Sequence, residues 1–565
     1  MFLPATKEEM KKLGWEYLDI ILVSGDAYID SYYSGVALIG NFLISKGFKV
    51  GIISQPDINS SVDITRLGEP KLFWGISAGC VDSMVANYTA LGKKRKSDDF
   101  TPGGENIKRP DRATIVYTNL IKRHFKKTVP IVIGGVEASL RRIAHYDFMD
   151  NALRKSILFD SKADILVYGM GEITTLELAL KLQNGEDYKN TKGICFIEKD
   201  KTKYVEKGYI ELPSFEEVSV DKFKFIEMFK TFYENNDPLN GRGLIQKTLD
   251  RYLIQNPPQR LLTSEEMDFI YGLPFEREVH PFDRKKGEVK AIHTIKFSLT
   301  THRGCYGECN FCAISVHQGK HIVSRSEKSI IDEIKKIVKH KDFKGYISDL
   351  GGPTANMYGI DCEKKKRDGA CKGKRCISPK ICSQIKISHK RQLNLLKEVR
   401  KIEGIKKVFV SSGIRPDLII EDKEFGKEYL KEIIHYHTSG QLKIAPEHSE
   451  QKVLTLMGKM KAEYVKQFKE MFDNLRDKDQ FLTYYFIAAH PGCNESDMIK
   501  LKKFIKENLK LTPEQVQIFT PTPSTFSTLM YYTELDPLSL TKIFVEKSQK
   551  GKEKQKNIIQ NISSR

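Results

Sequence analysis

The sequence predicts an α/β protein with an N-terminal doubly wound parallel sheet in residues 1–200 and a partial parallel (β/α)6 barrel in residues 291–530. Two observations favour this fold class. Short β-branched runs alternate with amphipathic stretches in both regions, which is typical of parallel strands covered by helices. The second region has six such strands, whereas a complete parallel barrel needs eight.

The N-terminal sheet is predicted from apolar runs of strand length. The expected strands are 17–23, 50–54, 72–76, 130–133, 165–168 and 194–197, and the expected helices include 35–45, 112–123 and 172–182. Ligands of such folds bind in the loops at the carboxyl ends of the strands. None of these loops completes a G-x-G-x-x-G fingerprint, so a dinucleotide site is not supported.

The rest of the chain is predicted to contain a linker, the barrel and a tail. Residues 201–290, with Pro257-Pro258 and mixed charge, are interpreted as a linker with short helices. The barrel strands are expected at 295–299, 346–350, 408–412, 442–445, 484–488 and 516–520, and helices such as 330–338 and 393–402 lie between them. Residues 531–565 form a basic C-terminal extension.

The formal net charge of +19 is concentrated in two segments. A cysteine-rich insert, residues 361–392, carries +8, and residues 547–565 carry +5, so only +6 is spread over the remaining chain. No apolar run approaches the roughly 18 residues of a membrane-spanning helix, and the N-terminus has no signal-peptide core. We therefore expect a cytoplasmic protein without membrane partners, whose ten cysteines are reduced.

Three cysteines follow the first barrel strand in the loop Thr301-His-Arg-Gly-Cys-Tyr-Gly-Glu-Cys-Asn-Phe-Cys312. Cys305, Cys309 and Cys312 have the spacing C-x3-C-x2-C, which places three thiolates around one soft metal centre. A structural zinc site requires four ligands, and a [4Fe–4S] cluster normally takes four cysteines. Three local thiolates therefore leave one coordination position for a ligand that is not protein.

This motif, in the loop after the first strand of a parallel barrel, resembles the signature of radical S-adenosylmethionine (radical SAM) enzymes. The resemblance implies a site-differentiated [4Fe–4S] cluster on Cys305, Cys309 and Cys312, whose open iron is chelated by SAM. It further implies reductive cleavage of SAM to a 5′-deoxyadenosyl radical that abstracts hydrogen from a substrate. An electron donor of the flavodoxin or ferredoxin type is the expected partner.

The same resemblance assigns residues to SAM binding. Gly351 and Gly352 match the double-glycine loop that receives the methionine end of SAM, and Phe311 matches the aromatic residue beside the adenine. Ser412 and Arg415 match positions of ribose or carboxylate contacts. Three further residues end barrel strands and either contact substrate or brace loops, and we favour the structural role: Glu447, His448 and His490.

Several segments resemble one uncharacterised radical SAM family, the YgiQ-like proteins. They are residues 25–30 (GDAYID), 47–56, 109–113, 134–139, 349–358 (DLGGPTANMY) and 444–448 (IAPEH). In that family the N-terminal domain is similar to cobalamin-binding domains, whose cobalt-ligating version carries D-x-H-x-x-G. Here Asp26 is followed by Tyr28 and Ser31, with no histidine, so ligation of cobalt by this loop is not supported. The alternatives are cobalamin bound without a protein ligand and a domain without cobalamin, and we favour the second.

The insert contains a second cysteine group, Cys362, Cys371, Cys376 and Cys382. Four thiolates in a stretch with little apolar content predict a second metal site, either an auxiliary iron–sulfur cluster or structural zinc. The alternative is four uncoupled thiols in a flexible loop, because the spacing matches no zinc template. The basic charge of the insert would attract an anionic substrate such as RNA, although aromatic residues for base stacking are missing.

A second hypothesis for the whole chain is a non-catalytic nucleic-acid-binding protein stabilised by two zinc sites. Its basic segments would contact phosphates. Six polar or glycine-rich loops at one barrel face disfavour this hypothesis, because a binding module has no need for them. Zinc without iron or sulfide after anaerobic purification would favour it.

Overall fold

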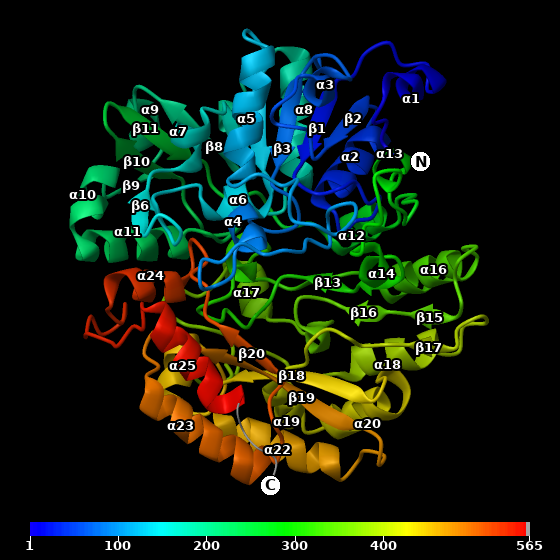
Figure 1. The fold of residues 1–565 in the computed structure, drawn as a ribbon, viewed down its shortest axis with the longest axis vertical. Helices are drawn as coiled ribbons and strands as arrows, with labels where there is room; N and C mark the ends of the chain where they lie inside the picture. Colours follow the sequence, from blue (N-terminus) through cyan, green and yellow to red (C-terminus); the bar gives the residue numbers. More distant parts are fainter. Residues whose placement is uncertain (561–565) are drawn as a thin grey trace. The chain divides into compact units, whose positions relative to one another are not determined.

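The computed structural model describes residues 1–560, and the chain divides into two compact units (Figure 1). Unit 1 consists of Met1–Leu261 with Phe269–Lys296, and unit 2 consists of Leu262–Asp268 with Phe297–Arg565. The last residues of the expected extension 531–565 lie outside the described part. None of the helices in the described part has both the length and the apolar character needed to cross a bilayer.

Unit 1 is built on a nine-stranded sheet with the order β2-β1-β3-β4-β7-β8-β11-β10-β9. Its first five strands are parallel: β2 (Val50–Ser54), β1 (Ile20–Ser24), β3 (Phe73–Ser77), β4 (Ile131–Gly134) and β7 (Ile165–Val167). Every residue of β1 and β2 is buried, as expected for parallel strands covered on both faces.

The helices of unit 1 cover both faces of this sheet. From β1 the chain crosses to β2 through α2 (Gly35–Ser45), then returns past β1 to β3 and on to β4 through α5 (Ala113–His124). Right-handed crossovers in opposite directions place α2 and α5 on opposite faces. Accordingly α2 contacts α8 (Glu172–Asn184), whereas α5 contacts α7 (Ile157–Ser161). The predicted doubly wound sheet is confirmed.

The sheet continues into the stretch that the sequence analysis interpreted as a linker. Strand β8 (Ile194–Glu198) pairs antiparallel with β11 (Arg251–Gln255), which forms a hairpin with β10 (Leu244–Thr248), and β10 pairs with β9 (Ile210–Leu212). Residues 201–261 are therefore part of the first unit. These strands have only three to five residues each and lie among polar residues and prolines, which is why periodicity did not reveal them.

A buried ion-pair network links the loops after β1 and β3, where the strand order reverses and open α/β sheets bind ligands. Arg109 lies 2.5 Å from Asp26 and 3.0 Å from Asp98. The backbone N–H of Cys80 donates to the other carboxylate oxygen of Asp26 at 2.7 Å. Burial raises the pKa of Asp26, and the Arg109 charge opposes that shift. The carboxylate is therefore held by partners within unit 1.

Unit 2 contains six successive parallel strand positions, as predicted. They are β12 (Ser298–Thr300), β15 and β16 (Tyr346–Ile347, Asp349–Gly351), β17 (Lys407–Val408), β18 (Gln441–Glu447), β19 (Phe481–Ala488) and β20 (Gln515–Ile518). Parallel ladders join β12 to β16, β15 to β17, and β18 to β19 to β20, and a parallel bridge from Ile414 to Ile444 connects the two halves.

Helices alternate with these strands and bury their apolar faces. They are α16 (Glu327–Val338), α18 (Lys390–Val399), α20 (Gly426–His437), α22 (Ala462–Asp473) and α23 (Glu495–Phe504). In α16, Ser326 caps the N-terminus and Ile330, Ile334 and Ile337 are buried in the core of unit 2. The partial parallel barrel predicted for this region is confirmed.

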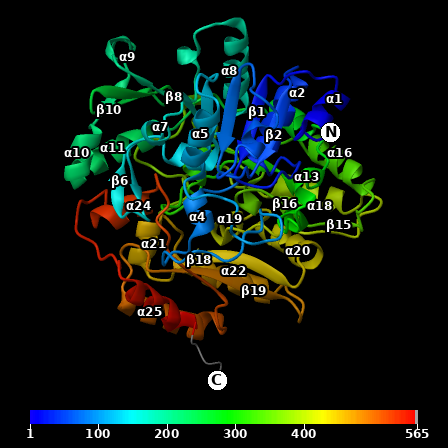
Figure 2. The same ribbon diagram turned by 45° about the horizontal axis from the view of Figure 1, so that its top comes forward.

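The described part of the C-terminal extension packs on the rest of unit 2. Helix α25 (Gln549–Gln560) packs on α23 and β20 (Figures 1 and 2). Gln555 accepts from the N–H of Ala489 at 3.0 Å and donates to the carbonyl of Cys493 at 3.2 Å. Lys552 is buried against the hydroxyl of Tyr531. The helix therefore supports the loop that follows β19.

The network around Arg109 generates a stability prediction. Arg109→Met would leave two buried carboxylates without their cation, so we expect the unfolding free energy of unit 1 to fall by roughly 3–5 kcal/mol. The measurement is the urea midpoint of its transition. Lys224→Met is the control, because Lys224 and its partner Glu227 are exposed, and it should leave the midpoint unchanged. Equal midpoints for both variants would contradict the role of Arg109.

Candidate metal centre

The cysteine loop begins where strands β12 and β13 (His302–Arg303) end. Gly304 has φ +78°, and a Cβ there would lie 1.7 Å from the carbonyl oxygen of His321. The chain can therefore turn at this position only without a side chain. Asn310 fixes the far part of the loop: its N–H donates to the carbonyl of Met457 at 2.8 Å.

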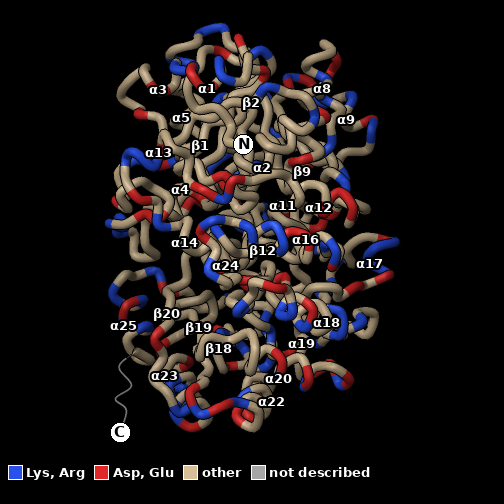
Figure 3. Tube along the Cα trace, turned by 90° about the vertical axis from the view of Figure 1, so that its right-hand side faces the viewer, with Lys and Arg blue, Asp and Glu red and all other residues tan. Residues whose placement is uncertain are grey.

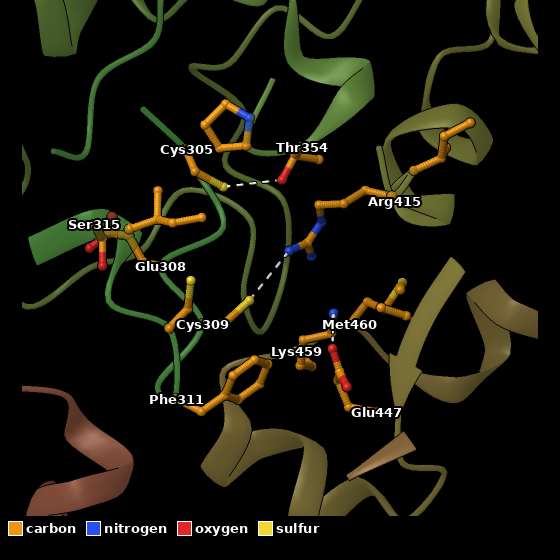
Figure 4. A pocket seen from close by; sticks show the side chains of 16 residues that line it. Cys305, Glu308, Cys309, Phe311, Ser315, Thr354, Arg415, Glu447, Lys459 and Met460 are labelled. Atoms are coloured by element: carbon orange, nitrogen blue, oxygen red, sulfur yellow. Dashed lines mark hydrogen bonds and ion pairs between the residues drawn. The ribbon is translucent and has the colours of Figure 1, made fainter. Parts of the chain in front are cut away.

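The three cysteines of this loop line one cavity (Figure 4). Its volume is about 180 Å³, whereas one water needs about 10–15 Å³, so the cavity accommodates a group much larger than a hydration site. Figure 4 shows the Cys305 and Cys309 thiols and the Arg415 guanidinium directed into the same space. The other lining residues are Glu308, Phe311, Cys312, Ile314, Ser315, Pro353, Thr354, Gly413, Ile414, Ala445, Glu447, Lys459 and Met460.

Gly307 lies between the sulfur atoms of Cys305 and Cys309. Its N–H donates to the sulfur of Cys305 at 3.3 Å, and an added Cβ would lie 3.1 Å from that sulfur and 3.6 Å from the sulfur of Cys309. Any side chain at this position would therefore project among the thiols. A backbone N–H aimed at a sulfur together with an open space between sulfurs fits an iron–sulfur core.

Two of the three thiols hold their protons more tightly than a free cysteine does. Burial raises the pKa of Cys305 and raises that of Cys312 to about 12. Metal binding must therefore displace protons from these thiols.

Arg415 supplies a fixed positive charge beside the thiols. Its Nε and Nη2 donate to the carboxylate of Asp417 at 3.0 and 2.6 Å, and its Nη1 points to the sulfur of Cys309 at 3.8 Å. Burial opposes the charge, but the Asp417 carboxylate raises the pKa of Arg415 above its usual value. The bidentate pair holds the guanidinium plane in one orientation.

The other residues predicted to bind SAM lie around this cavity in different ways. Phe311 lines it, with its ring 6.3 Å from that of His490. The lining includes Pro353 and Thr354, the two residues that follow Gly351-Gly352, and the hydroxyl of Thr354 lies 3.4 Å from the sulfur of Cys305. A Cβ on Gly352 would collide with the ring of His302 at 2.5 Å.

Ser412 lies beside Gly351 and donates its hydroxyl to the carboxylate of Asp349. A Cβ on Gly351 would lie 2.8 Å from that hydroxyl. Asp349 also accepts from the N–H groups of Ser411 at 2.8 Å and Ser412 at 3.2 Å. Asp349 therefore orders the loop after the third strand, and the hydroxyl of Ser412 is already engaged.

Glu447 and Lys459 form a buried ion pair on the cavity wall, with 3.7 Å between carboxylate and ammonium. Glu447 has φ +67°, a strained conformation for glutamate that places its side chain at the end of β18. Burial raises its pKa, and Lys459 opposes that shift. The sequence analysis did not assign a role to Lys459 or Thr354. Lys459 follows helix α21 (Gln451–Met457), whereas the candidate residues were sought at the ends of strands.

His448 and His490 brace the barrel loops. His448 accepts from the N–H of Glu450 at 3.0 Å through Nδ1, so its Nε2 carries the proton and points to the sulfur of Cys493 at 3.5 Å. His490 donates from Nδ1 to the carbonyl of Pro491 at 2.8 Å and accepts from the hydroxyl of Ser527 at 2.7 Å. Burial lowers their pKa values to about 4 and about 3, so both are neutral.

Two family models together match almost the whole described chain. Residues 2–298 match the Radical SAM N-terminal family, and residues 299–505 match the Radical SAM superfamily. A UPF0313 protein of Fusobacterium nucleatum is 58% identical over 99% of this chain and 98% of its own length. The chain belongs to the UPF0313 family of the radical SAM superfamily. A UPF0313 protein of Clostridium botulinum is 48% identical over 99% of this chain and 88% of its own length.

Two solved radical SAM enzymes share the fold of this UPF0313 protein. The methyltransferase TsrM of Kitasatospora setae, solved with cobalamin and a [4Fe–4S] cluster bound, covers 90% of this chain and 76% of its own with a TM-score of 0.51 and 13% identity. OxsB, solved with aqua-cobalamin bound, covers 93% of this chain and 57% of its own with a TM-score of 0.51 and 14% identity.

Membership of the superfamily decides between the two hypotheses for the whole chain. The protein is a radical SAM enzyme, with [4Fe–4S] and SAM as cofactors, and not a non-catalytic nucleic-acid-binding protein. Along the trace in Figure 3, Lys and Arg positions alternate with Asp and Glu positions.

The neutral histidines generate a pH prediction. The pKa of histidine in an unfolded chain is about 6.5. Between pH 6.5 and about 4, His448 and His490 are therefore protonated in the unfolded chain and neutral in the folded protein. Stability should therefore be complete above this window and fall as the pH is lowered through it, by up to about 1.4 kcal/mol per pH unit per histidine. Urea midpoints between pH 7.5 and 5 test this.

His490→Gln is the matched variant, because an amide can donate to Pro491 and accept from Ser527 without titrating. Its midpoint should depend less steeply on pH than that of the wild type. An identical slope in the two proteins would contradict the assignment of His490 as a buried neutral group.

Proposed function

We propose that Cys305, Cys309 and Cys312 hold a site-differentiated [4Fe–4S] cluster and that SAM completes the coordination of its open iron. The observation that carries the proposal is the lining of one cavity by these three thiols around Gly307. When bound, this pair of cofactors supplies a 5′-deoxyadenosyl radical that abstracts hydrogen from a substrate.

The residues around the thiols support SAM binding in the same cavity. Phe311 offers an apolar ring, and the loop that contains Gly351 and Gly352 continues into the cavity wall at Thr354. Arg415 offers a cation, and Ser412 orders the neighbouring loop through Asp349. The pair Glu447–Lys459 presents a carboxylate and an ammonium on the cavity wall, groups complementary to the amino and carboxylate ends of an amino-acid ligand.

The chemistry of the site suggests the class of electron donor and one class of substrate. A one-electron reductant is required, and we propose a donor of the flavodoxin or ferredoxin type in the cytoplasm. An anionic substrate such as RNA would be attracted by the insert with net charge +8. Of these basic residues, Lys365 is buried and Arg375 is bonded to the cysteine loop, so the charge that faces solvent is smaller than the count.

We propose that unit 1 functions without bound cobalamin. TsrM and OxsB were solved with cobalamin bound, which makes cobalamin the main alternative. In this chain the position of the ligating histidine is Tyr28, which is fully buried. Its hydroxyl donates to Asp30 at 2.8 Å and accepts from the N–H of Leu3 at 3.1 Å. These contacts do not fit a ligand to cobalt.

The cluster proposal is tested by the SAM-cleavage product. After anaerobic reconstitution with iron and sulfide, the wild type with dithionite and SAM should form 5′-deoxyadenosine, measured by chromatography. Cys309→Ala should lower that formation by roughly 10³-fold or more, because two thiolates do not retain the cluster.

Cys195→Ala is the control, because Cys195 is buried in strand β8 of unit 1. It should keep both the iron content and the product. Absence of 5′-deoxyadenosine from wild-type protein with a confirmed cluster would refute the proposal.

The cobalamin proposal is tested by binding. Reconstituted protein is incubated with hydroxocobalamin, passed through a desalting column and examined by its visible spectrum. We expect no cobalamin in the protein fraction. Retention at about one equivalent would overturn the proposal, and Tyr28→His would then show by a spectral shift whether this loop faces the cobalt.

A further inference from the structure

The insert of unit 2 brings most of its cysteines into one apolar group. Cys362 and Cys376 are buried in a cluster with Tyr306, and Cys382 packs against the same cluster. The N–H of Cys382 donates to the carbonyl of Cys376 at 2.8 Å, which closes a tight loop between them. Three of the four cysteines of the insert thus lie in or against one apolar cluster.

The fourth cysteine lies on a loop that glycines make possible. Cys371 is half-buried and lies between Gly369, with φ +81°, and Gly373, with φ +63°. The left-handed conformation at both positions lets the chain reverse on either side of the thiol. Such reversals are required when a short segment wraps around an inorganic centre.

The same insert contacts the loop that carries Cys305, Cys309 and Cys312. Arg375, next to Cys376, donates from Nη1 to the carbonyl of Glu308 at 2.8 Å and from Nη2 to the side-chain oxygen of Asn310. Its guanidinium also lies over the ring of Phe526, 5.2 Å from the centroid. One side chain of the insert therefore holds two positions of the cysteine loop.

A buried lysine makes a second connection. Lys365 of helix α17 (Glu363–Asp368) donates to the carbonyl of Lys320 at 2.8 Å and lies 3.8 Å from the carboxylate of Glu308. Its ammonium is 5.0 Å from the centroid of the Tyr306 ring. Tyr306 and Glu308 lie between Cys305 and Cys309, so α17 is fixed to the cysteine loop from the other side.

We propose that Cys362, Cys371, Cys376 and Cys382 ligate a second iron–sulfur cluster, which folds the insert into a clamp on the loop Gly304–Cys312. The clamp is made by Lys365 and Arg375. The inference goes beyond the proposed function and does not depend on SAM cleavage, because it concerns thiols outside the cavity. No electron transfer is part of the proposal.

The burial of the thiols supports a soft metal centre. Cys362 and Cys376 lie within the apolar cluster around Tyr306, and Cys382 packs against it. Thiolates hold both structural zinc and iron–sulfur clusters, and the metal analysis below distinguishes the two.

Uncoupled thiols do not account for the order of the insert. Residues 361–392 carry eleven basic and three acidic side chains and would repel one another as a free loop. In the structure Lys365 is buried with its ammonium bonded, and Cys362 and Cys376 are in the core of an apolar cluster. A bound metal centre supplies the free energy that orders such a segment.

The test separates the two sets of thiols. The variant Cys305→Ala/Cys309→Ala/Cys312→Ala is produced and reconstituted anaerobically, and iron, acid-labile sulfide and zinc are measured. We expect about four iron and four sulfide per chain in this variant and about eight of each in the wild type. A triple variant that contains no iron after reconstitution overturns the proposal, whether it has bound zinc or no metal at all.

A second variant keeps the test decisive if the triple variant does not fold. Cys371→Ala/Cys382→Ala replaces the two half-buried ligands, leaves only two thiolates, and should lower the wild-type iron content from about eight to about four. An unchanged iron content in this double variant overturns the assignment. Loss of 5′-deoxyadenosine in the wild type would refute the SAM-cleavage proposal but leave these metal counts standing, so the two failures are distinguishable.

Amide hydrogen exchange tests the contacts by which the insert holds the cysteine loop. Arg375→Met should increase amide hydrogen exchange in residues 304–312 by roughly tenfold, since the loop loses its bonds to the insert. Arg367→Met is the matched control, because Arg367 is exposed and pairs only locally with Asp368 among its described contacts. Equal exchange in Arg375→Met and Arg367→Met overturns the clamp.

Discussion

Three half-buried thiols that line one open cavity dominate the organisation of unit 2. The chain reaches this arrangement only by placing Gly304 against a carbonyl and Gly307 between two sulfurs. A loop of this kind gains little from packing on itself. Its shape is therefore held from outside, by Arg375 of the insert and by the carbonyl of Met457, which accepts from Asn310.

The sequence was sufficient for those parts of the fold that repeat a simple pattern. Buried parallel strands, the helices between them and a local cysteine motif all have short-range signals, and both regions were recognised from them. The strands of residues 210–255 were missed because three-residue and five-residue strands in polar surroundings obtain their burial from neighbours distant in the chain. Lys459 was missed for a related reason, since only the barrel brings it to Glu447.

Unit 1 combines a familiar sheet with an unusual set of loop contacts. At the point where the strand order reverses, the carboxylate of Asp26 is bonded to Arg109 and to the backbone of Cys80. Tyr28, two residues on, has both hydrogen-bonding positions of its hydroxyl engaged. The chain shares its fold with TsrM and OxsB, and in this chain the loops after β1 and β3 bind one another.

The guanidinium of Arg415 has a consequence for redox chemistry at the neighbouring thiols. It is buried, permanently charged, held by Asp417 and aimed at the sulfur of Cys309 at 3.8 Å. If the proposed iron–sulfur cluster binds Cys309, this fixed cation would stabilise the state of the cluster that carries one more electron, and so would raise its reduction potential. Arg415 would then set how strong a reductant must be to deliver that electron.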